Sequence, residues 1–480
     1  MYRPTSSLLR YGTLTLLTFC LPLQLHAEIS QTERNSTYQQ LETFANVLSI
    51  LQENYVDDIN SKKVMEGAIS GMLLSLDPHS SYLKPEDFKE LQEETEGSFS
   101  GIGIEITIEE GILTVVSPIA DTPAERAGLK AKDMVIKIDG EPTQNMNSME
   151  AIKKLRGLAG TQVTLAIHRD DWEELKDFTL TREDIPLHSV RHSFLEPGLA
   201  YIRITNFQSQ TTKDVKDALQ KLQGQHPING LILDLRNNPG GLLDQAVSVT
   251  DIFLDGGLVV YTKGRIMEQN MTFQAHSNGG KNLFPLVVLV NEGSASSSEI
   301  VTGAIQDHKR GIIVGAKTFG KGSVQTILPL PEGAGLRMTT ARYYTPNGRS
   351  IQATGITPDV EVPFVDSENT TKKSSPAVTI KEADLKNHIP NTDQVQESNP
   401  PPVPEKEPKP EQPPVLQNEP EKTEKPAKSP ESSDSSDNTE IQLDKDNQLR
   451  SALNILKSLK IYSTADYKKN PAQEPVQVKE

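Results

Sequence analysis

Hydrophobic residues recur at helical spacing near the start of the chain. Phe44, Leu48 and Leu51 predict one helix beginning near residue 41, and the run 64–76 predicts a second helix. Two short helices bury little surface on their own, so they need a partner surface from the rest of the chain or from a second subunit. We therefore assign residues 28–96 to an N-terminal helical region.

The pattern changes to short alternating segments between residues 97 and 184. Apolar and polar residues alternate over a few positions, and turn-forming residues separate the segments. This pattern predicts a small β-rich module inserted into the chain. The alternating segments are 102–108, 113–116, 134–138 and 163–168.

Residues 185–365 alternate short apolar runs with helical patterns. Such alternation is typical of an α/β core with a parallel sheet. The strand-like runs are 199–204, 231–235, 286–290 and 311–315, and the helical runs are 215–222 and 242–254.

The composition changes again after about residue 366. Residues 366–440 are rich in Pro, Glu, Lys and Ser and contain few apolar side chains, so we predict a disordered linker. Leucines at helical spacing predict a helix over 443–462, within a C-terminal segment 441–480. The linker is long enough for this helix to dock on the N-terminal helices of its own chain or of another.

The first 27 residues have the composition of a signal peptide. Arg3 and Arg10 precede the apolar run 14–23, and a small-residue cleavage site ends at Ala27. Cleavage there predicts an extracytoplasmic protein, either periplasmic or secreted. It also removes Cys20, the only cysteine, which leaves neither disulfides nor thiol chemistry. The net charge of −16 over 480 residues argues against nucleic acid as a main partner.

Two segments of the α/β region carry candidate chemistry. The serines of Asn291-Glu-Gly-Ser-Ala-Ser-Ser-Ser-Glu-Ile300 lie where a strand gives way to a helix N-terminus, which offers unpaired N–H groups to a developing negative charge. Ser296 to Glu299 also fits a helix capping box, so a structural role is open. Lys321 follows in a glycine-flanked segment. If Lys321 is shielded from water there, its pKa falls and its neutral amine can accept a proton from a serine. The alternative is a solvated surface lysine with no such role.

These two segments together resemble the carboxyl-terminal processing peptidases, also called tail-specific proteases. The matching motifs are Gly-Ser-Ala-Ser-x-Ser-Glu-Ile and Thr-Phe-Gly-Lys-Gly-x-Val-Gln. The resemblance implies that Ser296 is the nucleophile and that Lys321, 25 residues later, is the general base. It also implies that Gln325 supports the lysine through its side-chain carbonyl. Four residues of straight strand span about 13 Å, so the backbone must turn between Lys321 and Gln325.

A third motif, Asp234-Leu-Arg-Asn-Asn-Pro-Gly-Gly241, follows a predicted strand. Loops at the carboxyl ends of strands are where open α/β sheets place their ligands. The family resemblance implies that the backbone N–H groups of Gly241 and Ser297 form an oxyanion hole. An ordinary helix N-terminus after a turn is compatible with the same geometry.

The inserted module contains, in order, Ser100-Gly-Ile-Gly-Ile104, Pro123-Ala-Glu-Arg-Ala-Gly-Leu129, Gly140 and Leu155-Arg-Gly157. In these motifs it resembles a PDZ domain. A glycine loop of this kind captures a chain-terminal carboxylate while the bound peptide extends a sheet edge, although the glycines also fit an ordinary hairpin. We therefore expect substrates with apolar C-termini. The predicted contacts are Gly101, Ile102, Gly103 and Ile104 in the loop, and Met149 and Ile152 in the groove wall.

Two further residues are candidates for a role. Arg156, in Leu155-Arg-Gly157, is a candidate regulatory residue because a guanidinium makes directional bonds that can join the module to the core, with a surface arginine as the alternative. His79 lies in Asp77-Pro-His-Ser80, where a proline-anchored turn favours a structural role over a catalytic one.

The sequence thus predicts an α/β protease core with an inserted β-rich PDZ domain, N-terminal helices and a disordered C-terminal linker ending in a helix. We expect a serine endopeptidase that needs no cofactor and no metal. It is expected to dimerise through its N- and C-terminal helices. An adaptor protein is a further candidate partner. The alternatives are a catalytically silent PDZ scaffold that binds protein C-termini and an acyl hydrolase acting on small esters or wall components.

Overall fold

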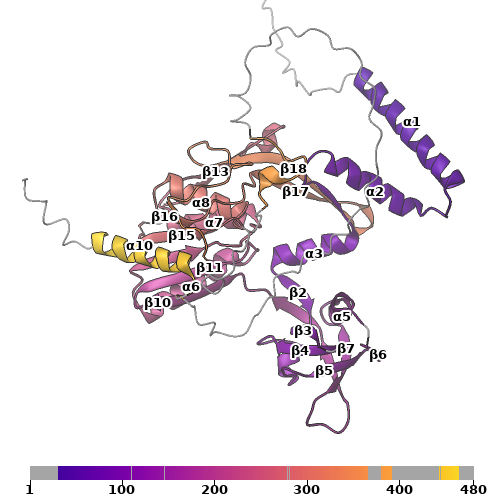
Figure 1. The fold of residues 1–480 in the computed structure, drawn as a ribbon, viewed down its shortest axis with the longest axis horizontal. Coiled ribbons are helices and arrows are strands. Elements are labelled where there is room, and N and C mark those ends of the chain that lie inside the picture. The colour runs from indigo at the N-terminus through magenta and orange to yellow at the C-terminus, as the bar shows by residue number, and fades with distance from the viewer. Residues whose placement is uncertain are drawn as a thin grey trace, which may run out of the picture. The chain divides into compact units, whose positions relative to one another are not determined.

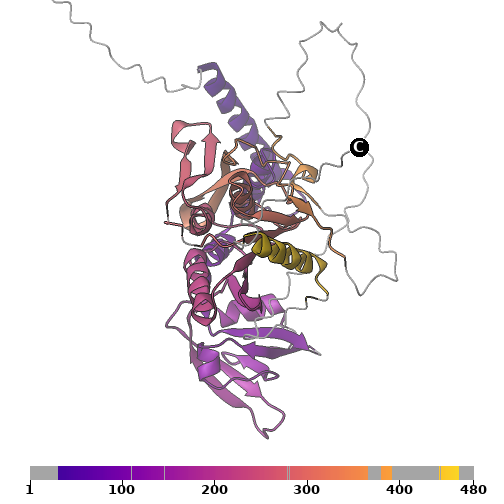
Figure 2. The same cartoon turned by 90° about the vertical axis from the view of Figure 1, so that its left-hand side faces the viewer.

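The computed structural model describes residues 31–365 except 110, 145, 278 and 281, together with 380–391, 443 and 445–463. The predicted signal peptide, and with it Ala27, lies outside the described residues. The chain divides into two compact units, Met1–Ala68 and Ile69–Glu480. Figure 1 labels the elements, and Figure 2 shows them from the side.

The N-terminal unit contains α1 (Gln31–Asn54) and the start of α2 (Ser61–Leu74). Both predicted helices are confirmed, and α1 begins ten residues before the position expected from its apolar pattern. The side chains of Phe44 and Leu51 are 40% and 37% exposed, so the apolar stripe of α1 is not buried within the described chain. A hydrogen bond of 2.8 Å from Gln52 to Ser61 joins the two helices across their connection.

The predicted β-rich module is confirmed as a separate sheet with its own core. Its strand order is β3-β4-β5-β7-β8, with β6 beside β5, so β3 lies at an edge. The core contains Leu113, Val135 and Leu165, all less than 3% exposed. The elements are β3 (Ile104–Glu109), β4 (Ile112–Pro118), α4 (Pro123–Arg126), β5 (Met134–Ile138), β6 (Glu141–Pro142), α5 (Ser148–Leu155), β7 (Gln162–His168) and β8 (Lys176–Thr181).

The module joins the rest of the chain through a two-stranded antiparallel ribbon. This ribbon pairs β2 (Ser98–Gly101) with β9 (Glu183–Pro186), so the two connections run side by side. It follows α3 (Pro85–Glu96), which ends at Gly97. Backbone hydrogen bonds hold the two connecting segments to each other up to Leu187, whose N–H donates to the Gly97 carbonyl at 2.8 Å.

The α/β core is built on a six-stranded sheet, as its strand and helix pattern predicts. The order is β10-β11-β12-β15-β16-β19, and every pair is parallel except β10 with β11. The strands are β10 (Val190–Glu196), β11 (Leu199–Ile204), β12 (Gly230–Asp234), β15 (Leu286–Val290), β16 (Ile312–Gly315) and β19 (Val360–Glu361).

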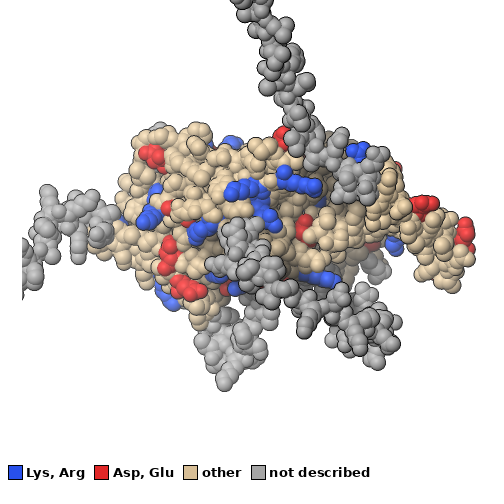
Figure 3. All heavy atoms as spheres, turned by 90° about the horizontal axis from the view of Figure 1, so that it is seen from above, with Lys and Arg blue, Asp and Glu red and all other residues tan. Residues whose placement is uncertain are grey.

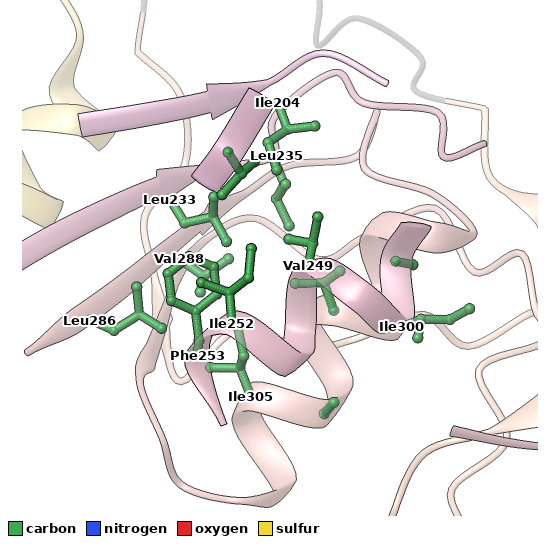
Figure 4. Packing of buried hydrophobic residues seen from close by; sticks show 14 of the residues in the cluster. Ile204, Leu233, Leu235, Val249, Ile252, Phe253, Leu286, Val288, Ile300 and Ile305 are labelled. Atoms are coloured by element: carbon green, nitrogen blue, oxygen red, sulfur yellow. The ribbon is translucent and has the colours of Figure 1, made fainter. Parts of the chain in front are cut away.

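Helices cover both faces of this sheet. One face packs against α6 (Thr211–Gln225), α7 (Leu243–Phe253) and α8 (Ser297–Asp307), as Figure 4 shows for part of that cluster. The other face packs against α10 (Asn447–Ser463) through Leu449, Leu453 and Leu456. Strands buried on both faces need apolar side chains at every position, which is why the runs 231–235 and 286–290 read as continuous.

The docking of α10 differs from the expectation. We predicted that the C-terminal helix packs on N-terminal helices, but α10 buries its leucines against β12, β15 and β16 of its own core. An ion pair fixes its start, because Asp446 accepts hydrogen bonds of 2.9 and 2.7 Å from Arg236.

A second sheet lies within the core region and was not predicted. Its order is β1-β18-β13-β14, with β17 on the other edge of β18. Its strands are interrupted in sequence by other elements, so no local pattern announces their pairing. They are β1 (Ser81–Leu83), β13 (Gly257–Gly264), β14 (Thr272–Ala275), β17 (Ser323–Pro329) and β18 (Gly335–Tyr344), with short 3-10 turns η1 (Met267–Gln269) and η2 (Pro331–Gly333).

The predicted linker 366–440 is wrong for residues 380–391. This segment contains a short 3-10 turn, η3 (Glu382–Asp384), and the side chains of Glu382 and Asn391 are 0% and 3% exposed. Hydrogen bonds to the core, rather than apolar burial, hold it, which explains why its composition did not reveal it. Residues 366–379 and 392–440 lie outside the described chain.

Basic and acidic side chains are interspersed on the face seen in Figure 3. None of the described helices is long and apolar enough to cross a membrane.

Candidate active site

The carboxyl ends of three parallel strands bring the candidate segments together. Asp234 of β12 pairs with Leu289 of β15, and Val290 pairs with Gly315 of β16. The loops that follow these strands therefore start side by side. They carry Gly241, Ser296 and Lys321 respectively, as the sequence motifs predicted.

Ser296 is the residue immediately before α8, and its backbone is strained. Its φ of 53° is positive, which is uncommon for a residue with a Cβ and costs energy unless the surroundings hold it. Two bonds hold it here. The Ser296 N–H donates to Glu299 Oε2 at 2.8 Å, and the Ala295 N–H donates to the Asn238 carbonyl at 3.0 Å.

Half of the predicted capping box is therefore present. Glu299 reaches back to the Ser296 N–H, but the Ser296 hydroxyl makes no capping bond to the helix. The hydroxyl instead lies beside the hydroxyl of Tyr343. Burial raises the pKa of Tyr343 well above its ordinary value, while the contact with Ser296 lowers it.

The other three serines of the cluster are engaged in structural bonds. Ser294 donates to the Leu235 carbonyl at 2.8 Å, and Ser298 donates to the Asn238 carbonyl at 2.9 Å. Ser297 donates to the Gly241 carbonyl at 2.8 Å. Each of these three residues is at most 1% exposed. Within this cluster, only the Ser296 hydroxyl is left for chemistry among the described contacts.

The glycine loop after β12 lies directly against Ser296. A Cβ added to Gly240 would lie 2.8 Å from the Ser296 Cβ and 3.0 Å from the Ser297 nitrogen, so only glycine permits this approach. Within the described part of the chain, the backbone N–H groups of Gly241 and Ser297 donate no hydrogen bond. Two unpaired N–H groups beside one hydroxyl are what an oxyanion hole requires.

Glu299 ties the serine segment to the lysine segment. Its Oε1 accepts from Thr318 Oγ1 at 2.5 Å and from the Gly320 N–H at 2.8 Å. Its Oε2 accepts from the N–H groups of Ser296 at 2.8 Å and Lys321 at 2.9 Å. Burial raises the pKa of Glu299 to about 7, although these four hydrogen bonds act to lower it.

Lys321 is half-buried in the loop between β16 and β17. Desolvation lowers its pKa, and the nearby Arg337 lowers it further, whereas the carboxylates of Glu382, Glu299 and Asp77 raise it. The net direction is downward, as expected for a lysine that serves as a base. The described contacts include no direct hydrogen bond between Lys321 Nζ and Ser296 Oγ. The two residues are joined through Glu299 and through Tyr343, whose hydroxyl donates to the Lys321 carbonyl.

Gln325 does not make the predicted bond to Lys321. Its Nε2 donates to Thr339 Oγ1 at 3.0 Å, and Thr339 in turn donates to Asp77 at 3.1 Å. Gln325 lies within β17, whose pairing with β18 is irregular between Val324 and Gln325. Gln325 therefore links β17 to β18 rather than to the lysine in this structure.

The turn around His79 reaches the site, which sequence reasoning did not foresee. Asp77 accepts from the N–H groups of His79 at 2.9 Å and Ser80 at 2.8 Å. Burial would raise the pKa of Asp77, but its hydrogen bonds lower it below the ordinary value. His79 Nε2 lies 2.8 Å from Glu382 Oε2, so His79 is paired with a carboxylate from the segment 380–391. The sequence Asp-Pro-His-Ser predicts a turn here. It does not reveal that His79 pairs with Glu382, which lies far along the chain.

The residues predicted to contact a peptide lie on β2, on the edge strand β3, in the turn between these strands and on α5. Gly103 has a φ of 75°, and a Cβ there would lie 2.3 Å from Thr122, so glycine is required. The remaining predicted contacts differ in exposure. Ile102 is 2% exposed and belongs to the core, whereas Met149 is 72% exposed and Ile152 is half-buried. Gly101 ends β2, and Ile104 begins the free edge of β3.

Arg156 connects the module to α3. Its Nη1 donates to Glu93 Oε2 at 3.0 Å, and its guanidinium lies 4.7 Å from the centre of the Phe99 ring. This places Arg156 across the ribbon that joins the module to the rest of the chain. The structure does not bring Arg156 to Ser296 or Lys321.

Among the described residues, no group of three or more His, Cys, Asp and Glu side chains is placed to hold a metal ion.

The fold and site together define an α/β enzyme with an inserted PDZ domain. Residues 198–362 match the model of peptidase family S41, residues 114–169 match that of the PDZ domain, and residues 22–87 match that of the activating protease CtpB N-terminal domain. The family that these matches indicate is the one that the sequence motifs resemble.

Relatives of known name agree with these matches. The chain is 44% identical over 364 residues to the carboxy-terminal-processing protease of Bartonella bacilliformis, which covers 75% of this chain and 83% of that protein. It is 41% identical over 326 residues to the carboxyl-terminal-processing protease of Synechocystis, covering 66% and 76%. A solved photosystem II D1 C-terminal processing protease is 33% identical, covers 68% of this chain and 87% of its own, and has a TM-score of 0.41. This chain belongs to the carboxy-terminal processing proteases of peptidase family S41, which are serine proteases.

Proposed function

We propose that this chain is an endopeptidase that cleaves peptide bonds with a dyad of Ser296 and Lys321. One observation carries the proposal. Ser294, Ser297 and Ser298 each donate their hydroxyl to a backbone carbonyl. The Ser296 hydroxyl contacts the Tyr343 hydroxyl instead and lies beside two unpaired N–H groups of the described chain. A half-buried lysine with a lowered pKa lies in the adjoining loop.

In acylation, neutral Lys321 accepts the proton of the Ser296 hydroxyl as Oγ attacks the peptide carbonyl carbon. The carbonyl oxygen becomes an oxyanion, which the N–H groups of Gly241 and Ser297 stabilise. The tetrahedral intermediate collapses, the C–N bond breaks, and the Lys321 ammonium returns its proton to the leaving amine. A water molecule then attacks the acyl-enzyme carbonyl and gives a proton to Lys321. The ester C–O bond breaks, Lys321 returns this proton to Ser296 Oγ, and the new C-terminus is released.

The dyad is tested by Ser296→Ala and Lys321→Ala. Both variants should retain the folded structure and lose cleavage of an unstructured protein with an apolar C-terminus. Mass spectrometry of the products identifies the cleaved bonds. Normal cleavage by either variant would exclude the dyad, and a silent PDZ scaffold would instead bind such a protein without releasing products.

We further propose that the PDZ domain selects substrates by their C-terminal part. The free edge of β3 allows a peptide to add as a strand, and the exposed Met149 of α5 provides an apolar contact beside it. Met149→Asp should weaken binding of a peptide with an apolar C-terminus, measured by calorimetry. If the affinity is unchanged, Met149 does not contact the bound peptide, and the binding site must lie elsewhere.

Arg156 is our candidate for coupling peptide binding to activity. Its bond to Glu93 depends on the orientation of the module relative to α3, and a ligand shifts such an equilibrium only if it prefers one orientation. A short apolar peptide added in trans should stimulate hydrolysis of an unrelated reporter, and Arg156→Ala should remove the stimulation. Competition and slower hydrolysis in both proteins would indicate simple tethering.

Assembly and location are also proposals. The exposed apolar stripe of α1 supports dimerisation through the N-terminal helices, and the leucines that α10 buries against its own core are not available to a second subunit. Sedimentation of Phe44→Glu should show a monomer if the stripe forms the contact. We propose an extracytoplasmic protein cleaved near Ala27, which N-terminal sequencing of the mature protein tests.

A further inference from the structure

The segment 380–391 is fastened to the loop that carries the lysine. On one side of Lys321, the Glu382 N–H donates to the Phe319 carbonyl at 3.3 Å. On the other side, the Gly322 N–H donates to Gln352 Oε1 at 2.9 Å, and Gln352 Nε2 donates to Glu382 Oε1 at 2.8 Å. The segment therefore grips the lysine loop both before and after Lys321.

Other contacts fix the segment as a whole. Asn391 Nδ2 donates to the Gln352 carbonyl at 3.0 Å, and Asn387 Nδ2 donates to the Leu74 carbonyl at 3.0 Å. The side-chain amide of Gln352 also donates to the Ile389 carbonyl at 3.1 Å. These bonds span the segment from η3 to its last described residue, so its conformation is defined by the core.

The carboxylate of Glu382 is buried and charged. It is 0% exposed, and it accepts from Gln352 and faces His79 Nε2 at 2.9 and 2.8 Å. Burial would raise the pKa of Glu382, but the bonds from His79 and Gln352 outweigh burial and lower it. Glu382 thus remains ionised at neutral pH and adds negative charge near Lys321.

We propose that Glu382 is a positioning residue for the lysine base: it fixes the Phe319–Gly322 loop and stabilises the ammonium that forms on Lys321 during acylation. This inference rests on the proposed dyad. The lysine becomes cationic only after it has taken the serine proton, so a fixed carboxylate favours the transition state over the ground state.

Other charged groups also face Lys321. Arg337 of β18 opposes its positive charge, whereas Glu299 of α8 and Asp77 before β1 favour it. Tyr343 of β18 bonds to the Lys321 carbonyl. Glu382 differs from these groups because it comes from a segment after the core and is itself paired with His79. Replacing Glu382 by glutamine leaves Arg337, Glu299 and Asp77 in place, so one of the charges that face Lys321 is removed.

The test is the pH dependence of kcat/KM for Glu382→Gln, measured with a cleavable peptide in the full-length protein. Glutamine keeps the shape and a carbonyl acceptor for Gln352, so the fold should persist. Without the carboxylate, Lys321 loses its proton more readily. The rising part of the curve of kcat/KM against pH should therefore move to lower pH by about half a unit or more. At pH values above this rise, kcat should fall about tenfold.

Two further variants keep the test decisive. Glu382→Asp retains the charge. Its kcat/KM should therefore rise over the same pH range as in the wild type, even though its rate falls. Asp384→Asn removes a charge from the exposed side of the same turn and should match the wild type. A Glu382→Gln curve that rises at the wild-type pH, or an equal displacement in Glu382→Asp, would overturn the inference. If the proposed dyad itself were wrong, Ser296→Ala or Lys321→Ala would instead remain active.

Discussion

Replacing Glu299 by glutamine should separate catalysis from folding. The carboxylate of Glu299 accepts four hydrogen bonds, two on each oxygen, from the segments that carry Ser296 and Lys321. A glutamine amide can accept at only one end. Its NH2 group would face two donors, so one pair of these bonds would be lost and the two loops would move apart.

The magnitude follows from two opposing effects. Two buried donors without partners cost about 2–6 kcal/mol together. Against this, raising the pKa of Glu299 from 4.5 to about 7 means that the buried charge costs about 3 kcal/mol, which glutamine removes. The free energy of unfolding should therefore change by no more than about 3 kcal/mol. Misplacing a nucleophile or base by about 1 Å costs about 100-fold in rate, so cleavage should fall at least that far.

The stability difference should also depend on pH. Because the folded-state pKa of Glu299 is raised, the folded wild type binds this proton more tightly than the unfolded chain does. Its stability contribution is full below the unfolded pKa and is lost as pH rises through about 7. The glutamine variant has no such group. Its stability relative to the wild type should therefore improve by about 3 kcal/mol across this window.

Two measurements check these expectations. Urea unfolding at several pH values should be done in a Ser296→Ala background, which prevents self-cleavage, and product release should be followed with Ser296 intact. Glu292→Gln is the matched control, since the same change four residues before the nucleophile removes no described bond of Glu299. Wild-type cleavage by Glu299→Gln would refute the reasoning, as would a loss of stability that makes the variant unfold.

Three further outcomes are expected. Leu453→Ala should lower the free energy of unfolding by about 2–4 kcal/mol, because Leu453 is buried between α10 and the sheet, whereas Asn454→Ala, on the exposed side, should change it little in the same urea titration. Ser298→Ala should lower the free energy of unfolding by about 1–3 kcal/mol but retain cleavage, and an inactive but folded variant would show that the nucleophile is misassigned. Cleavage should rise with pH through the lowered pKa of Lys321, because only the neutral amine accepts a proton; a rate that falls over this range in a pH-rate profile would contradict lysine as the base.

The sequence could predict the parts of the site that lie within single loops. The serine cluster and the Phe-Gly-Lys-Gly segment each follow a short apolar strand, and parallel strands bring their carboxyl ends to one edge. Local patterns therefore located the serine cluster, the lysine segment and the glycine loop before Gly241, whereas the choice of Ser296 within the cluster came from the family resemblance. The same logic gave the order of domains, because each domain has its own period of apolar residues.

The parts that were missed depend on contacts between distant segments. β18 pairs with β1, β13 and β17, which come from three different regions of the chain, and no local period encodes those pairings. The bond expected between Gln325 and Lys321 failed for a related reason. The irregular pairing before Gln325 directs its amide toward Thr339 of β18, a partner that single-strand geometry does not reveal.

Two segments beyond the core brace the two sides of the site. Arg236 lies in the loop that leads to Gly241 and is held by Asp446, at the start of α10, and by Asp234. Burial would raise the pKa of Asp446, but its bonds from Arg236 lower it, so the pair is ionised at neutral pH. Removing Asp446 would leave Arg236 with Asp234 as its remaining carboxylate partner, so α10 contributes to holding the loop that leads to Gly241.

The lysine loop depends in the same way on Glu382. Both braces follow the last strand of the core sheet, β19, although neither contributes a strand to it. A chain ending at residue 365 would retain Ser296, Lys321 and Gly241 but would lose the groups that fix two of their three loops. Residues up to 365 are therefore insufficient to hold the site in this form. Two of its loops are held by side chains that come later in the chain, Asp446 and Glu382.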